Sequence, residues 1–276
     1  MGGDQPRYSW TEAEKDLMEG IDTTVPHSAR IWNYWLGGKD NYPVDREAGE
    51  AFVKVYPGIV DDARAYRQFL TRTIRYLVTE ANIYQFLDIG TGLPTVDNTH
   101  EVSQRLNPAC RIVYADNDPL VLAHARALLT STPEGVTDYV DADLHDPDQI
   151  LDAAARTLDF SAPIALILSG VMGHIADDEG PHAIVRRLVD RLPSGSYLML
   201  QDSTVVSQEN AEALEDYNQS GAVPYNLRTP QQIFDFFDGL ELVEPGIVPI
   251  QTWHPDVTPA EPLTQENTFG GIGLKR

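Results

Sequence analysis

Three aspartates, each following a short apolar segment at a nearly equal interval, constrain the fold of this chain more than any other feature. Asp88 lies within residues 86–94 (Phe-Leu-Asp-Ile-Gly-Thr-Gly-Leu-Pro), and Asp116 and Asp143 follow 28 and 27 positions further along. Each interval matches the length of one strand, one helix and a return strand in an α/β sheet. The spacing therefore predicts a doubly wound, mostly parallel sheet in which the three acids lie at the ends of neighbouring strands.

A tight Gly-x-Gly turn follows the first apolar segment. Gly90 and Gly92, on either side of Thr91, let backbone N–H groups approach a ligand where a Cβ atom would collide. Residues 111–115 (Arg-Ile-Val-Tyr-Ala) are typical of a buried parallel strand, and Asp116 at its carboxyl end can accept hydrogen bonds from the cis hydroxyls of a ribose. The turn and the acid together predict a nucleoside pocket.

The third acid favours adenine as the base. Residues 137–140 are typical of another strand, and the sequence Asp-Ala-Asp-Leu follows it. Asp143 can accept a hydrogen bond from an exocyclic amine, while Leu144 packs on the base.

Dinucleotide oxidoreductases share the glycine turn and the ribose acid, so the cofactor needs a further argument. Their fingerprint has a third glycine, which would fall at position 95, but Thr95 stands there after Pro94. Asp88 would repel a pyrophosphate, whereas it could organise the turn and attract an ammonium group through water. S-adenosylmethionine carries an amino acid, a sulfonium and no phosphate, so these residues fit it better.

The chain resembles the class I S-adenosylmethionine-dependent methyltransferases, and within them a bacterial group long catalogued as a domain of unknown function. The resemblance covers nearly the whole chain, and its most specific part is Leu-Gly-Gly-Lys-Asp-Asn at 36–41. Two positions depart from the pattern: Leu93-Pro94 replace a glycine common in class I enzymes, and Asn33 stands where this group has an aspartate. The other matching segments are 28–30, 45–46, 86–94, 115–119, 141–143, 236–240, 243–246 and 269–273.

The resemblance implies a Rossmann-like sheet of seven strands, the last one antiparallel, with S-adenosyl-L-methionine as the cofactor. Small residues after a strand at 163–168 should leave room for the methionine part of that cofactor. The predicted cofactor-binding residues are Asp88, Gly90, Thr91, Gly92, Asp116, Asn117, Asp143, Leu144, Ser169 and Gly170.

We expect residues 1–81 to form an N-terminal helical extension and lid, and residues 82–276 to form the cofactor-binding domain. Residues 28–36 are typical of a short aromatic helix that stops at Gly37-Gly38. A glycine pair followed by polar residues makes a poor core but a workable lid. The predicted lid and substrate residues are Tyr34, Gly38, Lys39, Asp40, Asn41 and Tyr42.

The remaining elements follow from hydrophobic periodicity. Helices are predicted at 61–81, 96–106, 120–129, 148–157, 181–192, 208–219 and 230–237, and strands at 86–89, 112–115, 137–140, 163–168, 196–201, 240–243, 247–249 and 268–274.

Methyl transfer is an in-line displacement that needs alignment rather than an enzyme nucleophile. A general base is required only when the acceptor proton must leave early. His174 is the best-placed candidate, and Tyr34 and Asp40 are weaker ones. The alternative for His174 is a structural role, in which it caps the next helix or bonds a backbone carbonyl.

The formal net charge of −22 opposes binding to nucleic acids. Arginines at positions 64, 67, 72 and 75 form the one basic concentration, which either balances neighbouring acids on a solvated face or helps to hold an acidic acceptor or shape the pocket. No metal is expected, because the cluster from Asp141 to Asp146 lacks the glycine and glutamate of a calcium loop.

The single Cys110 and the polar first residues indicate a cytoplasmic protein with no membrane segment. The leading hypothesis is transfer of a methyl group to an unidentified acceptor, more plausibly a small molecule than a protein side chain. The alternative is a non-catalytic protein that senses S-adenosylmethionine or S-adenosylhomocysteine, and a dinucleotide oxidoreductase comes third. The oligomeric state stays open.

Overall fold

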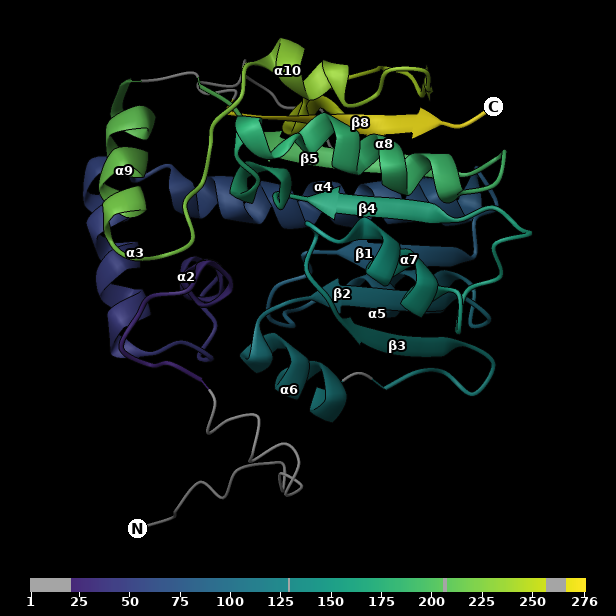
Figure 1. The fold of residues 1–276 in the computed structure, drawn as a ribbon, viewed down its shortest axis with the longest axis horizontal. Helices are drawn as coiled ribbons and strands as arrows, with labels where there is room; N and C mark the ends of the chain where they lie inside the picture. The colour runs from purple at the N-terminus through teal and green to yellow at the C-terminus, as the bar shows by residue number, and fades with distance from the viewer. Residues whose placement is uncertain (1–20, 129, 206–207, 257–266) are drawn as a thin grey trace.

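A mostly parallel sheet forms the centre of the molecule (Figure 1). The computed structural model describes residues 21–128, 130–205, 208–256 and 267–276. Across these residues the strand order is β3-β2-β1-β4-β5-β8-β6, with β7 also paired to β8. Strands β1 to β5 pair with one another in parallel, and β8 is antiparallel to β5, β6 and β7. The strands are β1 Gln85–Ile89, β2 Arg111–Asp116, β3 Val136–Asp141, β4 Ala165–Ser169, β5 Tyr197–Ser203, β6 Glu241–Leu242, β7 Val248–Pro249 and β8 Thr268–Leu274.

Helices cover both faces of the sheet, because alternate side chains of its buried strands point to opposite faces. In β1, Leu87 packs into the core beneath α7 and α8, whereas Phe86 packs into the core beneath α4 and α5. Figure 1 shows the first pair of helices in front of the sheet and the second pair behind it. These helices and two others are α4 Ile59–Thr79, α5 Thr99–Leu106, α6 Pro119–Leu128, α7 Pro147–Ala154, α8 Pro181–Arg191 and α10 Pro230–Asp235.

A separate group of helices stands at the end of the sheet toward which the arrow of β4 points (Figure 1). It consists of α2 Ser28–Trp35, α3 Pro43–Val55 and α9 Gln208–Gln219. Phe52 of α3 joins them, because its ring lies 5.2 Å from that of Trp35 and 6.2 Å from that of Tyr217. We call these three helices, together with residues 220–228, the cap.

The predicted doubly wound sheet is confirmed, and two details differ. The described residues form eight strands rather than seven, because two short segments, β6 and β7, each pair with β8. Helix α3 was not predicted, although Pro43 opens it and the Asp45 carboxylate accepts a hydrogen bond from the Tyr42 N–H. Residues 1–20 of the predicted extension and the last residue of the helix predicted at 120–129 lie outside the described residues. No helix in the described parts of the chain is long and apolar enough to cross a membrane.

Candidate functional site

A cavity of about 390 Å³ opens at the carboxyl ends of β1, β2 and β4, beneath helix α2. Its volume falls in the range of small-molecule sites. The structure brings nine of the ten predicted cofactor-binding residues into its wall, and Asp88 is the exception. The nine are Gly90, Thr91, Gly92, Asp116, Asn117, Asp143, Leu144, Ser169 and Gly170.

The floor of the cavity is the glycine turn after β1. Gly90 and Gly92 both have positive φ angles, +71° and +63°, which side chains rarely adopt. A Cβ atom on Gly90 would lie 2.4 Å from the side chain of Val171, whereas one on Gly92 would meet nothing within 4 Å. The turn at Gly92 therefore presents its bare backbone to the cavity.

Asp116 fixes this turn from the neighbouring strand. One carboxylate oxygen accepts the Gly92 N–H at 3.0 Å, and the other accepts the Asp118 N–H at 3.0 Å. Each oxygen keeps a second lone pair, so the carboxylate can still accept two hydrogen bonds from a ligand. Burial raises the pKa of Asp116 above its ordinary value.

Asp143 lies in a chain of polar contacts at the edge of the cavity. Its Oδ2 accepts a hydrogen bond from Asn117 at 2.9 Å, and its Oδ1 lies 2.5 Å from Nδ1 of His145. Nε2 of His145 lies 3.5 Å from a carboxylate oxygen of Glu179. Burial acts to raise the pKa of Asp143, but the hydrogen bonds from His145 and Asn117 outweigh it and lower that pKa. The hydrogen bond to Asp143 raises the pKa of His145.

Asp88 lies behind the floor rather than in the wall of the main cavity. It is buried, accepts a hydrogen bond from the Thr99 hydroxyl at 2.6 Å, and burial raises its pKa to about 6. It lines a second cavity of about 20 Å³ together with Arg67, Gly92 and Tyr139. Such a space is large enough for a water molecule with polar partners.

The four arginines of helix α4 do not form one patch. Arg64 and Arg75 pair with Asp61 and Asp256, at 3.0 and 2.5 Å, on the exposed surface. Arg72 is buried and donates to the backbone carbonyls of residues 250 and 253. Arg67 alone among the four lines the cavity. The prediction that they balance neighbouring acids thus holds for two of them.

The roof of the cavity is helix α2. The α2 residues that line the cavity are Ser28, Ala29, Trp32 and Asn33, and Leu36 follows them. None of the predicted lid residues, which the structure describes in full, lines the cavity: these are Tyr34, Gly38, Lys39, Asp40, Asn41 and Tyr42.

The predicted lid loop instead lies beyond α2 and supports it. Asn33 accepts hydrogen bonds from the Asp40 N–H at 3.0 Å and from the Asn41 side chain at 2.9 Å. The Tyr34 hydroxyl lies 3.3 Å from Glu50, on α3. The loop therefore orients the roof residue Asn33, and its Tyr42 packs against the small apolar cluster that contains the cavity residue Leu93.

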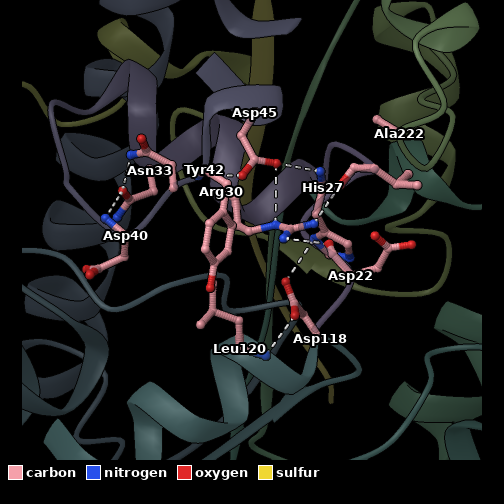
Figure 2. Close-up of polar contacts among 12 residues, drawn as sticks. Asp22, His27, Arg30, Asn33, Asp40, Tyr42, Asp45, Asp118, Leu120 and Ala222 are labelled. Atoms are coloured by element: carbon pink, nitrogen blue, oxygen red, sulfur yellow. Dashed lines mark hydrogen bonds and ion pairs between the residues drawn. The ribbon is translucent and has the colours of Figure 1, made fainter. Parts of the chain in front are cut away.

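Polar contacts tie the start of α2 to the floor (Figure 2). Nδ1 of His27 lies 2.9 Å from Asp118, the residue whose N–H bonds Asp116. The buried Asp45 accepts the His27 N–H at 2.9 Å and pairs with Arg30 at 3.4 Å. Figure 2 shows these side chains converging between α2 and the start of α6. The roof is thus connected to the carboxylate that fixes the glycine turn.

His174 is the one predicted catalytic candidate that lines the cavity. It ends the 3-10 helix η1 (Met172–His174), and its Nδ1 lies 3.0 Å from the carbonyl oxygen of Pro224. A carbonyl only accepts, so this contact assigns the proton to Nδ1 and leaves the lone pair of the neutral ring on Nε2. Burial lowers the pKa of His174 and favours that neutral form. The predicted bond to a backbone carbonyl is confirmed, and it is compatible with a role as a base.

The cap holds the segment that carries His174. The Asn226 N–H donates to the Gly173 carbonyl at 2.7 Å, and the Tyr225 ring lies 5.0 Å from the His174 ring, edge to face. The buried Arg228 donates to the carbonyls of Met172 and Ile175, both at 2.7 Å. Sequence reasoning missed these contacts, which join segments about 50 positions apart.

Comparisons with known proteins agree with this geometry. Residues 14–276 match the model of a family described as S-adenosyl methyltransferase. A DUF574 family protein from Streptomyces avermitilis is 45% identical, with a TM-score of 0.89 over 92% of this chain and 99% of its own. A candidate methyltransferase from Thermobifida fusca is 38% identical, with a TM-score of 0.86 over 93% and 97%.

A more distant structure shares the fold alone. The plantazolicin methyltransferase BamL is 13% identical, with a TM-score of 0.50 over 96% of this chain and 99% of its own. No curated protein matches the sequence significantly. The chain therefore belongs to the S-adenosyl methyltransferase family, and it is an enzyme that uses S-adenosylmethionine as its methyl donor.

Proposed function

We propose that the enzyme methylates a small molecule bound between the glycine turn and helix α2. One observation carries this proposal: the same cavity is lined by the predicted cofactor residues, by His174 and by the apolar side of the roof. A cofactor on the floor and an acceptor beneath the roof would then share one cavity.

The residues of the floor fit an adenosyl cofactor. Asp116 keeps two free lone pairs for ribose hydroxyls, and Asp143 keeps one on Oδ2 for an exocyclic amine. Leu144 offers a buried apolar surface for the base, and Gly92 leaves room for close approach. When bound, S-adenosylmethionine supplies an electrophilic methyl group on a positively charged sulfur.

The acceptor that suits the roof is a neutral or weakly polar molecule with one O–H or N–H group. Trp32, Leu36, Ala63 and Ile175 provide apolar contact, and the rings of Trp32 and Tyr66 lie 5.1 Å apart. The net charge of −22 works against a polyanionic acceptor.

We retain residues 1–81 as the extension and 82–276 as the catalytic domain, with α9 and residues 220–228 completing the cap.

His174 is the proposed base for an acceptor that must lose its proton. Its Nε2 carries the lone pair, and the contacts of Asn226 and Arg228 with its segment hold the ring in one position. Alignment of the reacting groups contributes more than the base, at roughly 7–11 kcal/mol of barrier reduction. His174 would matter most for hydroxyl acceptors, and little for amines that are already neutral.

Calorimetry with S-adenosylmethionine, S-adenosylhomocysteine and NAD tests the cofactor site. We expect the first two to bind and NAD not to bind. Asp116→Ala should weaken binding by at least about tenfold, because a charged hydrogen-bond acceptor is lost. Asp141→Ala is the matched control, because Asp141 lies opposite Asp116 in the register of β2 and β3 but outside the cavity wall. Tight NAD binding would overturn the assignment.

A measurement of methyl transfer distinguishes the proposed catalytic role from a role in sensing the cofactor. With radiolabelled S-adenosylmethionine, we expect the label to move into the small-molecule fraction of a bacterial extract. If the label enters protein instead, the acceptor class is wrong. If the cofactor binds but the label stays on it in every fraction, the sensing role replaces the proposed one.

A further inference from the structure

We propose that Arg67 binds the carboxylate of the cofactor's amino-acid part and makes that carboxylate a requirement for tight binding. This inference rests on the proposed cofactor site. It adds a residue that the sequence motifs do not contain, because Arg67 lies on α4, outside the sheet loops that form the floor.

The guanidinium of Arg67 is oriented but incompletely paired. Its Nη2 donates to the carbonyls of Val96 and Asp97, at 3.1 and 2.9 Å, beside the floor loop. Its Nε is buried without a hydrogen-bond partner. Nη1 makes no hydrogen bond with the residues that the structure describes. A fixed arginine with unused donors is well suited to a carboxylate.

The charges around the cavity leave one place for a carboxylate. Among the described residues that line it, Arg67 is the only lysine or arginine. The adenosine end carries Asp116 and Asp143, which would repel a second anion. His27 and His145, also in the wall, already pair with Asp118 and Asp143. A ligand carboxylate therefore gains most beside Arg67.

Asp88 provides the opposite charge beside Arg67. Arg67 and Asp88 both line the small cavity behind the floor. Gly92 lines this small cavity and also the main cavity, so the two cavities adjoin there. The two charges match the two charges of an α-amino acid, with the ammonium group toward Asp88 and the carboxylate toward Arg67. A ligand that lacks the carboxylate would leave the unused N–H donors of the half-buried Arg67 without an acceptor.

The test compares two ligands that differ only in the carboxylate. Calorimetry would measure S-adenosylhomocysteine and its decarboxylated analogue, which both lack the sulfonium charge. We expect the wild type to prefer S-adenosylhomocysteine by at least about tenfold. Arg67→Met should weaken that ligand by at least about tenfold and the decarboxylated analogue by less than about twofold.

Arg64→Met is the matched control, because Arg64 lies on the same helix and pairs with Asp61 on the surface. It should change neither affinity. Equal losses of both ligands in Arg67→Met would show that Arg67 only holds the loop at Val96 and Asp97, and would overturn the proposal.

A wild type that binds both ligands within about threefold would also overturn it, even if Arg67→Met does not fold. Neither result would affect the proposed function, because S-adenosylhomocysteine would still bind; a wild type that does not bind S-adenosylhomocysteine at all would contradict the proposed function itself.

Discussion

The floor and the roof of the cavity are built in different ways. The floor consists of loops after parallel strands, in which backbone atoms and hydrogen bonds between neighbouring strand ends, such as that from Gly92 to Asp116, fix the shape. The roof is a helix whose position depends on side chains from α3, α4 and α9 and on Asp118, which precedes α6. The cofactor half of the cavity therefore follows from sheet geometry, whereas the acceptor half follows from packing between distant segments.

Replacing the proposed base should have the largest effect, and it should be confined to turnover. His174→Gln removes the imidazole ring, whose Nδ1 lies against the Pro224 carbonyl, and keeps a side chain of similar reach. Turnover with a hydroxyl acceptor should fall by about 10²–10⁴. The transfer of radiolabelled methyl measures this, and calorimetry should show unchanged affinity for S-adenosylhomocysteine. Unchanged turnover would assign His174 to the framework of the cap.

A side chain on the floor should block the cofactor without unfolding the protein. Gly92→Ala and Gly239→Ala both place a Cβ atom at a positive φ angle with nothing within 4 Å, so each should cost about 1–2 kcal/mol of stability. Only Gly92 lines the cavity. We expect Gly92→Ala to weaken S-adenosylhomocysteine by at least about tenfold in calorimetry, and Gly239→Ala to bind normally. Equal affinities would place the cofactor elsewhere.

Cofactor affinity should fall with acidity because burial raises the pKa of Asp88 to about 6. A ligand ammonium group favours the ionised carboxylate, so below pH 6 binding must displace a proton and affinity drops by up to about tenfold per pH unit. Calorimetry between pH 7 and 5 measures this, and Asp88→Asn should flatten the profile.

The same shift acts on the stability of the free protein with the opposite trend. The contribution of Asp88 to the free energy of unfolding is fully present below the ordinary aspartate pKa of about 3.9, and it is lost as the pH rises through about 6. An affinity that rises toward pH 5 would contradict a contact between Asp88 and the ammonium group.

A change at Tyr34, a predicted lid residue on α2, should have the smallest effect. Tyr34→Phe removes only a hydroxyl that lies 3.3 Å from Glu50 on the exposed side of α2. Stability should change by less than about 0.5 kcal/mol, and cofactor affinity and turnover should stay within about twofold. Thermal unfolding and the labelled-methyl assay measure these quantities. A tenfold loss of turnover would instead show that Tyr34 contributes to the substrate site, as the sequence predicted.

The sequence predicted most of the sheet because its signals are local. The apolar residues of β1, β2 and β4 are buried on both faces of the sheet, so they stand out in the sequence as short hydrophobic runs. The sequence did not predict α3. Pro43 and Asp45 are its only helix-start signals, and the preceding Gly-Gly pair favoured a loop there. His145 had a readable signal, since it follows Asp143 at an interval that allows a local hydrogen bond.

The side chains that surround an acceptor were less predictable. Arg67 resembles Arg64 in sequence, and only the rotation of α4 about its axis brings one to the cavity and leaves the other in solvent. That rotation depends on both the sheet and α2, which pack on different sides of the helix. Likewise, the residues that position His174 come from the segment 224–228, which no local pattern connects to it.

By itself, the sequence determined the doubly wound sheet, the glycine turn and the placing of two acids at the ends of adjacent strands. These features follow from the fixed period of a strand and the length of a strand-helix unit. Only the tertiary structure decided that α2 forms the roof, that Arg67 faces the cavity and that residues 224–228 hold His174. Such contacts depend on the simultaneous packing of segments far apart in the chain, and no local spacing encodes them.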